Sequence, residues 1–517
     1  MNQVVETFER RARVIPDHGL GLSVDLYSPD LFDLIEVLET EAGGAGVPCG
    51  YLEIFKAAEQ GLARVRRRLP GVTFNYHAEG LWVTQPDMAT AYPLEAELET
   101  AARHLRILGS HWFTHECASK QMAGYSFGTY LPPVYTRAAA AVVASNVDRV
   151  QGALDRRLGG DEGRGPLLLL EMPPLTYFAF GDLAVPEFFR LVAEATPCGL
   201  VLDIGHLWTV ARYTGAWRSQ SLQRFVQAFL ERFPLDRVIQ IHVAGLAVHE
   251  PPSHGDRHVG DGEPVPWIDA HGAPIPAVLF DMLDQVLAHP GLVNLKGVAL
   301  EVDTKSIPEI VREFGAFRRR FARWVERPGP VGIGGSASSV PAARPGSRGS
   351  AEQEAGADLV HLYADYARAV AGVDWEAVRR LPALGIEPGS LEAYRTYLRH
   401  EILAWGGALT DMFPQTCKAL ERAGVALDEF LAFWFREARP ATTPYDFFLL
   451  KVERFREFVG ETLPSAASLA AREAEDLRQA YQTVNELVGR EQEAVKREEN
   501  EQVFTLRQSW AEARVSR

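Results

Sequence analysis

Histidine and acidic residues recur at the ends of short apolar runs in this sequence. His77, His115 and Glu171 end three successive runs, and a fourth run, GLVLDIGH, ends in Asp203 and His206. Imidazole and carboxylate groups are costly to bury unless they are paired or bind a cation. Both are also common ligands of transition metals. If the runs end at one place in the fold, these residues predict a metal centre.

The same pattern continues toward the C-terminus. His242 lies in the next run, Glu301 ends the last one, and Asp269 and His271 lie between them. Residues two apart share one face of an extended segment, so Asp269 and His271 could point at one ion. By the same rule Glu116 should point away from His115, and we do not expect it to be a ligand.

The predicted ligands form one set, of which Asp203, His206 and Glu301 are also the predicted catalytic residues. The full set is His77, His115, Glu171, Asp203, His206, His242, Asp269, His271 and Glu301. Zinc usually takes four ligands and an octahedral ion six, so this set exceeds the need of one ion and predicts two or three. The ligand types suit iron, manganese or zinc. His206 contributes only if the chain turns back at Gly205, because Asp203 and His206 do not share a strand face.

Eight apolar runs alternate with longer amphipathic stretches in the first part of the chain. Most of these runs are continuously apolar, which is typical of buried parallel strands. They cover residues 19–26, 50–55, 71–77, 111–117, 167–173, 199–206, 238–245 and 297–303. Eight strands with intervening helices predict an α/β fold, a (β/α)8 TIM barrel of the xylose-isomerase type. In such barrels the active site lies at the C-terminal ends of the strands, which is where the predicted ligands are found.

A segment rich in Gly, Pro, Ser and Ala, residues 327–358, divides the chain. It lacks periodicity and is predicted to be a flexible linker. The barrel domain is then expected at residues 1–326. Residues 359–465 carry apolar residues at helical spacing and predict an all-α domain, followed by a charged helical tail at residues 466–517.

Composition and charge argue against several classes of protein. The 517 residues carry a formal net charge of −15, which disfavours a nucleic-acid partner. No apolar stretch is long enough to span a membrane, and the N-terminus lacks the apolar run of a signal peptide. The four cysteines are scattered without a Cys-x-x-Cys pair, as is typical of reduced thiols. We therefore expect a cytoplasmic protein that binds neither nucleic acid nor membranes.

The order of the motifs over residues 18–320 resembles that of a known family, the multinuclear non-heme iron-dependent oxidases typified by the methanobactin oxidase. The resemblance rests on NYHAEG, FTHECAS, LLLEMP, GLVLDIGHLW, IHVAG, IDAHGAPIP and LEVD, which together contain all the predicted ligands. The sequence departs from the family in two places. Many members have Asn where this chain has Met172, and many have His where it has Leu246. These departures leave the subclass, and so the product, open.

The resemblance implies a function. It implies two or three iron ions as cofactor, dioxygen as co-substrate, and a cysteine-containing ribosomally made precursor peptide, which loses hydrogen from the carbon next to sulfur. The C-terminal stretch LEAYRTYLRHEILAWGGALTDMFPQTCKAL, followed by FLAFWF and PYDFF, resembles the helical partner subunit of the methanobactin oxidase. That similarity implies that oxidase and partner are fused here in one chain, and in the family the partner helps to present the precursor peptide.

Two other functions fit a metal-dependent barrel. One is a different barrel enzyme, such as a sugar isomerase or an apurinic-type endonuclease, although the acidic balance speaks against the endonuclease. The other is a peptide-binding scaffold with structural metals, although such sites are normally closed by few ligands. Bound iron together with consumption of oxygen would separate the oxidase from these alternatives.

Overall fold

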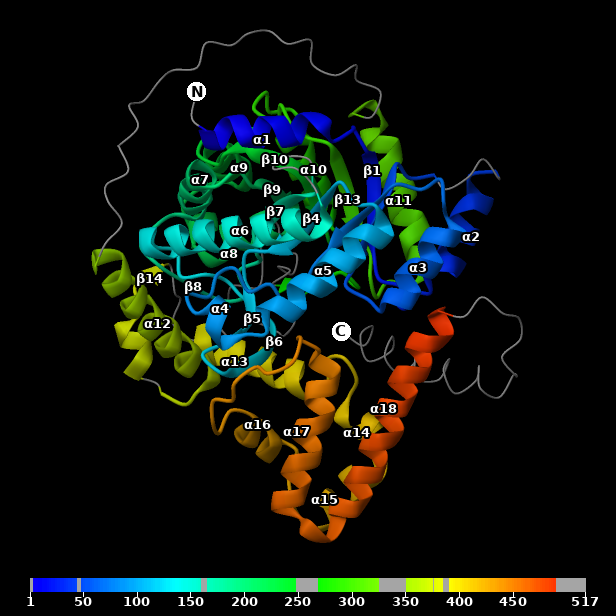
Figure 1. Cartoon of the computed structure of the whole chain (residues 1–517), viewed down its shortest axis with the longest axis vertical. Coiled ribbons are helices and arrows are strands. Elements are labelled where there is room, and N and C mark those ends of the chain that lie inside the picture. Colours follow the sequence, from blue (N-terminus) through cyan, green and yellow to red (C-terminus); the bar gives the residue numbers. More distant parts are fainter. Residues whose placement is uncertain are drawn as a thin grey trace.

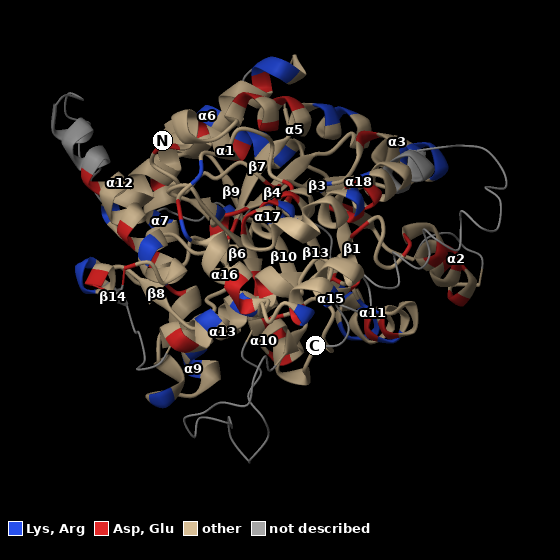
Figure 2. Ribbon diagram, turned by 90° about the horizontal axis from the view of Figure 1, so that it is seen from below, with Lys and Arg blue, Asp and Glu red and all other residues tan. Residues whose placement is uncertain are grey.

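A closed barrel of eight parallel strands forms the first part of the protein. The computed structural model describes residues 3–43, 48–159, 165–247, 268–324, 350–374, 376–384 and 390–489. The barrel strands are β1 (Gly19–Val24), β2 (Tyr51–Phe55), β3 (Phe74–His77), β4 (Trp112–Glu116), β7 (Leu167–Glu171), β9 (Gly199–Asp203), β10 (Val238–Val243) and β13 (Gly297–Glu301). They follow one another around the barrel in chain order, and β13 closes it against β1. Figure 1 shows the barrel above the C-terminal helices, and Figure 2 looks at it from the side of those helices. All eight predicted strands and the predicted TIM barrel are confirmed.

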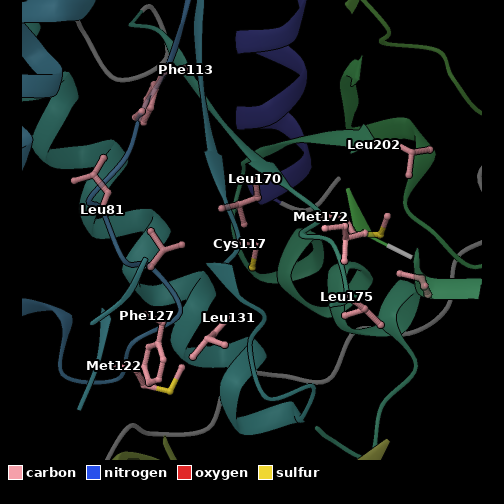
Figure 3. Packing of buried hydrophobic residues seen from close by; sticks show 14 of the residues in the cluster. Leu81, Phe113, Cys117, Met122, Phe127, Leu131, Leu170, Met172, Leu175 and Leu202 are labelled. Atoms are coloured by element: carbon pink, nitrogen blue, oxygen red, sulfur yellow. The ribbon is translucent and has the colours of Figure 1, made fainter. Parts of the chain in front are cut away.

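Side chains of the barrel strands alternate between the interior and the surrounding helices. On β4, Trp112 and Thr114 point inward, because both donate hydrogen bonds across the barrel to the side chain of Gln240 on β10. The outward side chains of the same strands form a separate apolar layer (Figure 3). That layer includes Phe113 and Leu170, which belong to a different cluster from Trp112. This alternation decides below which strand-end residues face the site.

Helices surround the barrel as the amphipathic stretches predict. They are α1 (Gln3–Val14), α2 (Leu31–Glu41), α3 (Glu59–Arg68), α4 (Met88–Ala91), α5 (Leu94–Leu108), α6 (Arg137–Leu158), α7 (Val185–Ala195), α8 (Ile204–Tyr213), α9 (Leu222–Leu230), α10 (Ala277–Leu287) and α11 (Ile307–Phe321). Helix α1 closes the N-terminal end of the barrel, where Phe8, Ala12 and Ile15 pack with Trp112 and other interior residues. The opposite end, where the strands finish, is left for the site.

The C-terminal region is helical, in agreement with the sequence. Its helices are α12 (Ser350–Ala371), α13 (Ser390–Leu403), α14 (Leu409–Met412), α15 (Pro414–Arg422), α16 (Asp428–Trp434), α17 (Phe447–Thr462) and α18 (Ala467–Gly489). Helix α12 begins inside the predicted linker, so residues 350–358 are helical rather than linker. The rest of that linker, from residue 327 to 349, lies outside the described residues, as does the tail beyond residue 489.

The helical region docks on a β-hairpin that follows β4. The hairpin consists of β5 (Ser119–Met122) and β6 (Tyr125–Leu131). Trp434 Nε1 donates to the carbonyl of Ser126 at 2.7 Å, and Arg439 N–H donates to that of Gly124 at 2.7 Å. A Cβ at Gly128 would lie 2.5 Å from the ring of Phe447, so only glycine allows this close approach. A short strand, β14 (Ala383–Leu384), also pairs with β8 (Ala179–Phe180) beside the barrel.

Two further expectations concern cysteines and membranes. The cysteines Cys49, Cys117, Cys198 and Cys417 are all free, and Cys117 is buried beside the outward layer of β4. Among the described residues, no helix combines the length and apolarity that crossing a membrane requires.

Candidate metal centre

Acidic and histidine side chains converge at the C-terminal ends of the barrel strands. Viewed from the side of the C-terminal helices, acidic segments gather at the centre of the barrel around β4, β7 and β9 (Figure 2). Four of these side chains, Glu171, Asp203, His242 and Glu301, place ligand atoms within 4.8 Å of one another. All four are buried. We refer to them as the first ligand group.

A second ligand group consists of Glu116, Glu171 and His206, also with ligand atoms within 4.8 Å of one another. Glu171 therefore belongs to both groups. Its Oε1 lies 2.9 Å from His242 Nδ1 of the first group. A carboxylate has two oxygens that can serve two ions, so the arrangement suits neighbouring metal ions that share Glu171.

Three more predicted ligands lie against these groups. His77 Nε2 lies 3.2 Å from Glu171 Oε2. His271 Nε2 lies 3.1 Å from Asp269 Oδ2 and 3.4 Å from Glu301 Oε2. Asp269 and His271 therefore point to the same place, although His271 lies in a turn after β12 rather than in the extended segment that the spacing argument assumes. Asp269, on the short strand β12 (Ile268–Asp269), also lies 3.4 Å from His206 Nε2.

Each of three histidines has one ring nitrogen held by a group outside the ligand groups. His206 Nδ1 lies 2.6 Å from the carbonyl of Met172, and His271 Nδ1 lies 2.5 Å from Asp303 Oδ1. His242 Nε2 lies 2.9 Å from Glu53 Oε2. In every case the other nitrogen faces the cluster. Metal-binding histidines have this arrangement, in which the second nitrogen donates to a carboxylate or carbonyl.

Buried oxygens without hydrogen bonds also fit a bound cation. Asp203 Oδ2, Asp269 Oδ1 and Glu116 Oε2 are buried and have no hydrogen-bond partner in the described part of the chain. An unsatisfied buried carboxylate oxygen is unfavourable unless a cation neutralises it. The residues present therefore fit metal ions with oxygen and nitrogen ligands.

The charge balance of the cluster supports the same conclusion. Burial raises the pKa of Asp203 to about 7, with the nearby carboxylates of Asp269 and Glu301 adding to the effect of burial and His206 opposing it. Burial and the neighbouring carboxylate of Glu171 likewise raise the pKa of Glu116. Carboxylates this close repel one another when all of them are ionised. Positive charge among them would offset this repulsion, and metal ions would supply it.

His115 is not part of the cluster, and Glu116 is. The alternation on β4 places Glu116 inside with Trp112 and Thr114, while His115 faces outward. His115 Nε2 accepts the N–H of Leu81 at 3.0 Å, and its Nδ1 donates to the carbonyl of Glu116 at 2.7 Å. Burial lowers the pKa of His115 to about 4, so the ring is neutral and both nitrogens are occupied. The sequence-based prediction that His115 is a ligand and that Glu116 points away from the site is therefore wrong.

His206 reaches the site from a helix rather than from a loop. Asp203 caps α8, its Oδ1 accepting the N–H of His206 at 2.6 Å. The first turn of the helix carries His206 back toward the strand end. A Cβ at Gly205 would lie 3.2 Å from Asp203 Oδ1 and 3.4 Å from Asp269 Oδ1, so a larger residue would press on both carboxylates.

A pocket with a volume of about 380 Å³ opens above the cluster. Its floor includes His77, Glu116, Asp269, His271 and Glu301. Its walls come from both parts of the chain. The barrel contributes Phe55, Lys56, Lys120 and Tyr130, and the helical region contributes Tyr397, Glu401 and Trp405.

Comparison with known families assigns the barrel part of the chain to one family. Residues 50–319 match the model of the RiPP precursor modification enzymes MbnB/TglH/ChrH. The chain belongs to this family. The matched residues contain both ligand groups and confirm the family resemblance of the sequence motifs. RiPPs are ribosomally synthesised peptides that are modified after translation, so the family assignment indicates a precursor-modifying enzyme.

Several bacterial proteins share the barrel part of the sequence. A UPF0276 protein of Bordetella pertussis is 30% identical over 284 residues, which cover 53% of this chain and 82% of that protein. A UPF0276 protein of Caulobacter vibrioides is 27% identical over 286 residues, covering 53% of this chain and 85% of its own length. One from Paraburkholderia phytofirmans is 31% identical over 170 residues, or 32% of this chain and 46% of that protein.

Solved structures resemble the chain only distantly. Endonuclease IV from Thermus thermophilus is 14% identical with a TM-score of 0.36, over 59% of this chain and 99% of that chain. D-Psicose 3-epimerase from Clostridium cellulolyticum is 12% identical with a TM-score of 0.32, over 59% of this chain and 94% of that chain. Alignments at this level carry no inference about activity.

Proposed function

We propose that this protein uses iron and dioxygen to oxidise a cysteine residue of a ribosomally made precursor peptide. The observation that carries the proposal is the pair of ligand groups sharing Glu171, of which Glu116 and Glu301 line a pocket. Membership in the family of RiPP precursor modification enzymes supplies the class of substrate. The mixed imidazole and carboxylate ligands, without a thiolate, suit non-heme iron.

The described residues divide into two iron sites in this proposal. Glu171, Asp203, His242 and Glu301 would hold one ion, and Glu116, Glu171 and His206 a second. His77, Asp269 and His271 complete these sites or hold a third ion. When bound, iron supplies one-electron redox chemistry and activation of dioxygen.

The chain itself provides orientation and exclusion of water. Asp303 accepts the Nδ1 proton of His271 and so keeps Nε2 directed at the cluster. The aromatic rings of Phe55, Tyr130 and Trp405 line the pocket and would displace water around an entering cysteine side chain. Lys120 lies 2.5 Å from Glu79 and 4.4 Å from the ring centre of Tyr130, which fixes its charge at the pocket wall.

The helical region at residues 359–465 acts in this proposal as a partner domain in the same chain. Tyr397, Glu401 and Trp405 bring it to the wall of the pocket. Thr129 of β6 and Tyr397 share a hydrogen bond of 3.2 Å between their hydroxyls, which links that wall to the barrel. A peptide entering the pocket would therefore touch both parts.

Activity of the purified protein with a peptide tests the proposal. The protein is loaded with Fe(II) without oxygen and incubated with a candidate cysteine-containing precursor peptide, with and without oxygen. We expect a mass change of the peptide only with both iron and oxygen, and none when the peptide cysteine is replaced by serine. Asp203→Ala should abolish the change. Glu95→Gln, at a side chain that is 82% exposed on α5, should not.

Three outcomes would contradict the oxidase. Full activity without oxygen in a protein that holds only zinc would favour another barrel enzyme. An Asp203→Ala variant with full activity would separate the cluster from the reaction. Tight metal binding with no modification of the bound peptide would favour a scaffold.

A further inference from the structure

A carboxylate that the strand-end pattern does not include lies inside the barrel beneath the first ligand group. Glu53, in the middle of β2, is fully buried. Its register partner on β1 is Ser23, which in turn pairs with Glu301 of the cluster on β13. Glu53 therefore lies two strands away from a predicted ligand and shares the barrel interior with it.

A chain of hydrogen bonds leads from Trp112 and Thr114 through Gln240 to Glu53, which is the final acceptor. Trp112 Nε1 can only donate, and it donates to Gln240 Oε1 at 2.9 Å. Thr114 Oγ1 donates to the same oxygen at 3.1 Å. The amide nitrogen of Gln240 must then face the other way, where it donates to Glu53 Oε2. This oxygen is therefore an acceptor.

His242 is the second donor to that oxygen. Its Nε2 lies 2.9 Å from Glu53 Oε2, so Nε2 carries the proton. Its Nδ1 lies 2.9 Å from Glu171 Oε1 and 3.4 Å from Glu301 Oε1, among the ligands of the first group. A cation at this group would replace the proton on Nδ1, while the proton on Nε2 stays with Glu53.

We propose that Glu53 is a positioning residue of the metal centre, oriented by Gln240 and Trp112, that fixes His242 with Nδ1 presented to the ion. This inference rests on the metal sites of the proposed function. Loss of such an outer carboxylate typically weakens metal binding about 10- to 100-fold, because the ring loses both its orientation and part of its basicity.

Binding of Co(II) alone tests the inference without a peptide. The affinity of the full-length protein for Co(II) is measured by competition with a chelator, and the visible absorption of the bound ion reports its ligand geometry. We expect Glu53→Met to bind about 10- to 100-fold more weakly and with an altered spectrum. Glu53→Gln keeps an acceptor oxygen for Gln240 and His242, so its spectrum should stay close to that of the unmodified protein, with a smaller loss of affinity.

A matched control separates positioning from general destabilisation. Gln151 is a buried glutamine on α6 whose side chain bonds Asp155 and the N–H of Leu168, and neither residue belongs to a ligand group. Gln240→Leu should weaken Co(II) binding, whereas Gln151→Leu should not, although both remove buried hydrogen bonds. Equal affinity and an unchanged spectrum in Glu53→Met would overturn the inference. If the unmodified protein bound no metal, the proposed function itself would fail instead.

Discussion

At the scale of single residues, the orientation of two neighbours on β4 decides which of them can bind metal. Glu116 shares the interior with Trp112 and Thr114, and His115 has both ring nitrogens bonded to backbone groups. Glu116→Ala leaves only Glu171 and His206 in the second ligand group. We expect this variant to bind roughly half as much iron as the unmodified protein, measured by elemental analysis after anaerobic loading.

The matched variant is His115→Gln. It should retain the full iron content and lose about 1–3 kcal/mol of unfolding free energy, because it leaves buried backbone groups less well satisfied. Iron loss in His115→Gln together with full iron content in Glu116→Ala would show that the assignment of the two faces is wrong.

A buried histidine away from the cluster predicts how stability depends on pH. Burial lowers the pKa of His104 to about 4 from an ordinary value of 6.5, and its Nδ1 lies 3.0 Å from the hydroxyl of Tyr76. Between these two pH values the unfolded chain binds a proton that the folded protein excludes. The contribution of neutral His104 to the free energy of unfolding is therefore fully present above pH 6.5. It is lost as the pH falls toward 4, by about 3 kcal/mol in total.

Replacement of His104 isolates this contribution. The unfolding free energy of metal-free protein, measured in urea at pH 7 and pH 5, should fall less for His104→Gln than for the unmodified protein. The difference in slope should approach one proton, or about 1.4 kcal/mol per pH unit. Identical slopes would mean that His104 is protonated in the folded state.

At the scale of elements, the residue that caps α8, Asp203, is also a candidate metal ligand. Asp203 ends β9, caps α8 through His206 N–H and offers its other oxygen to the cluster. Asparagine can also cap a helix, whereas alanine cannot. We expect both Asp203→Asn and Asp203→Ala to lose iron from the first group, while metal-free Asp203→Ala is about 1 kcal/mol less stable than metal-free Asp203→Asn.

Helix α6 provides the comparison for this prediction. Its cap, Thr136, accepts the N–H of Ala139 at 3.2 Å and belongs to neither ligand group. Thr136→Ala should cost about 1 kcal/mol in urea unfolding without any change in iron content. If Asp203→Asn bound iron as tightly as the unmodified protein, the carboxylate charge would not be needed and Asp203 would be a cap alone.

The elements were more predictable from the sequence than the orientations within them. Continuous apolar runs mark parallel strands buried on both faces, so all eight strands and the site at their ends could be expected. Such runs lack the polar alternation that shows which face is inside, and this is why His115 and Glu116 were assigned to the wrong faces. Thr114, the polar residue two positions before Glu116, was the available signal.

Two other features depend on tertiary contacts that no local pattern contains. Glu53 lies inside an apolar run rather than at its end, and only the cross-barrel contact with His242 shows its connection to the site. The turn that returns His206 was expected at Gly205, but it is the first turn of α8, which local spacing did not distinguish from a loop.

At the scale of the whole molecule, the helical region and the barrel share one pocket. Glu97, a buried residue of α5, connects the two. Its Oε2 lies 2.7 Å from Nζ of Lys56 at the pocket wall, and its Oε1 accepts the N–H of Tyr445 at 2.7 Å. A Cβ at Gly80 would lie 2.4 Å from Glu97 Oε1, so the carboxylate fits closely between the two parts. The contact predicts that Glu97 holds the segment before α17 against the barrel.

Hydrogen exchange of the intact protein tests this contact. We expect peptides that cover residues 441–447 to exchange about 10- to 100-fold faster in Glu97→Ala, because the Tyr445 amide loses a charge-assisted bond worth about 1–3 kcal/mol. Glu99→Ala, two positions away on α5 at a side chain that is 50% exposed, should leave this exchange unchanged. Glu97→Gln keeps an acceptor for the amide and should fall between them. Unchanged exchange in Glu97→Ala would mean that the other contacts, such as that of Trp434 with Ser126, suffice to dock the helical region.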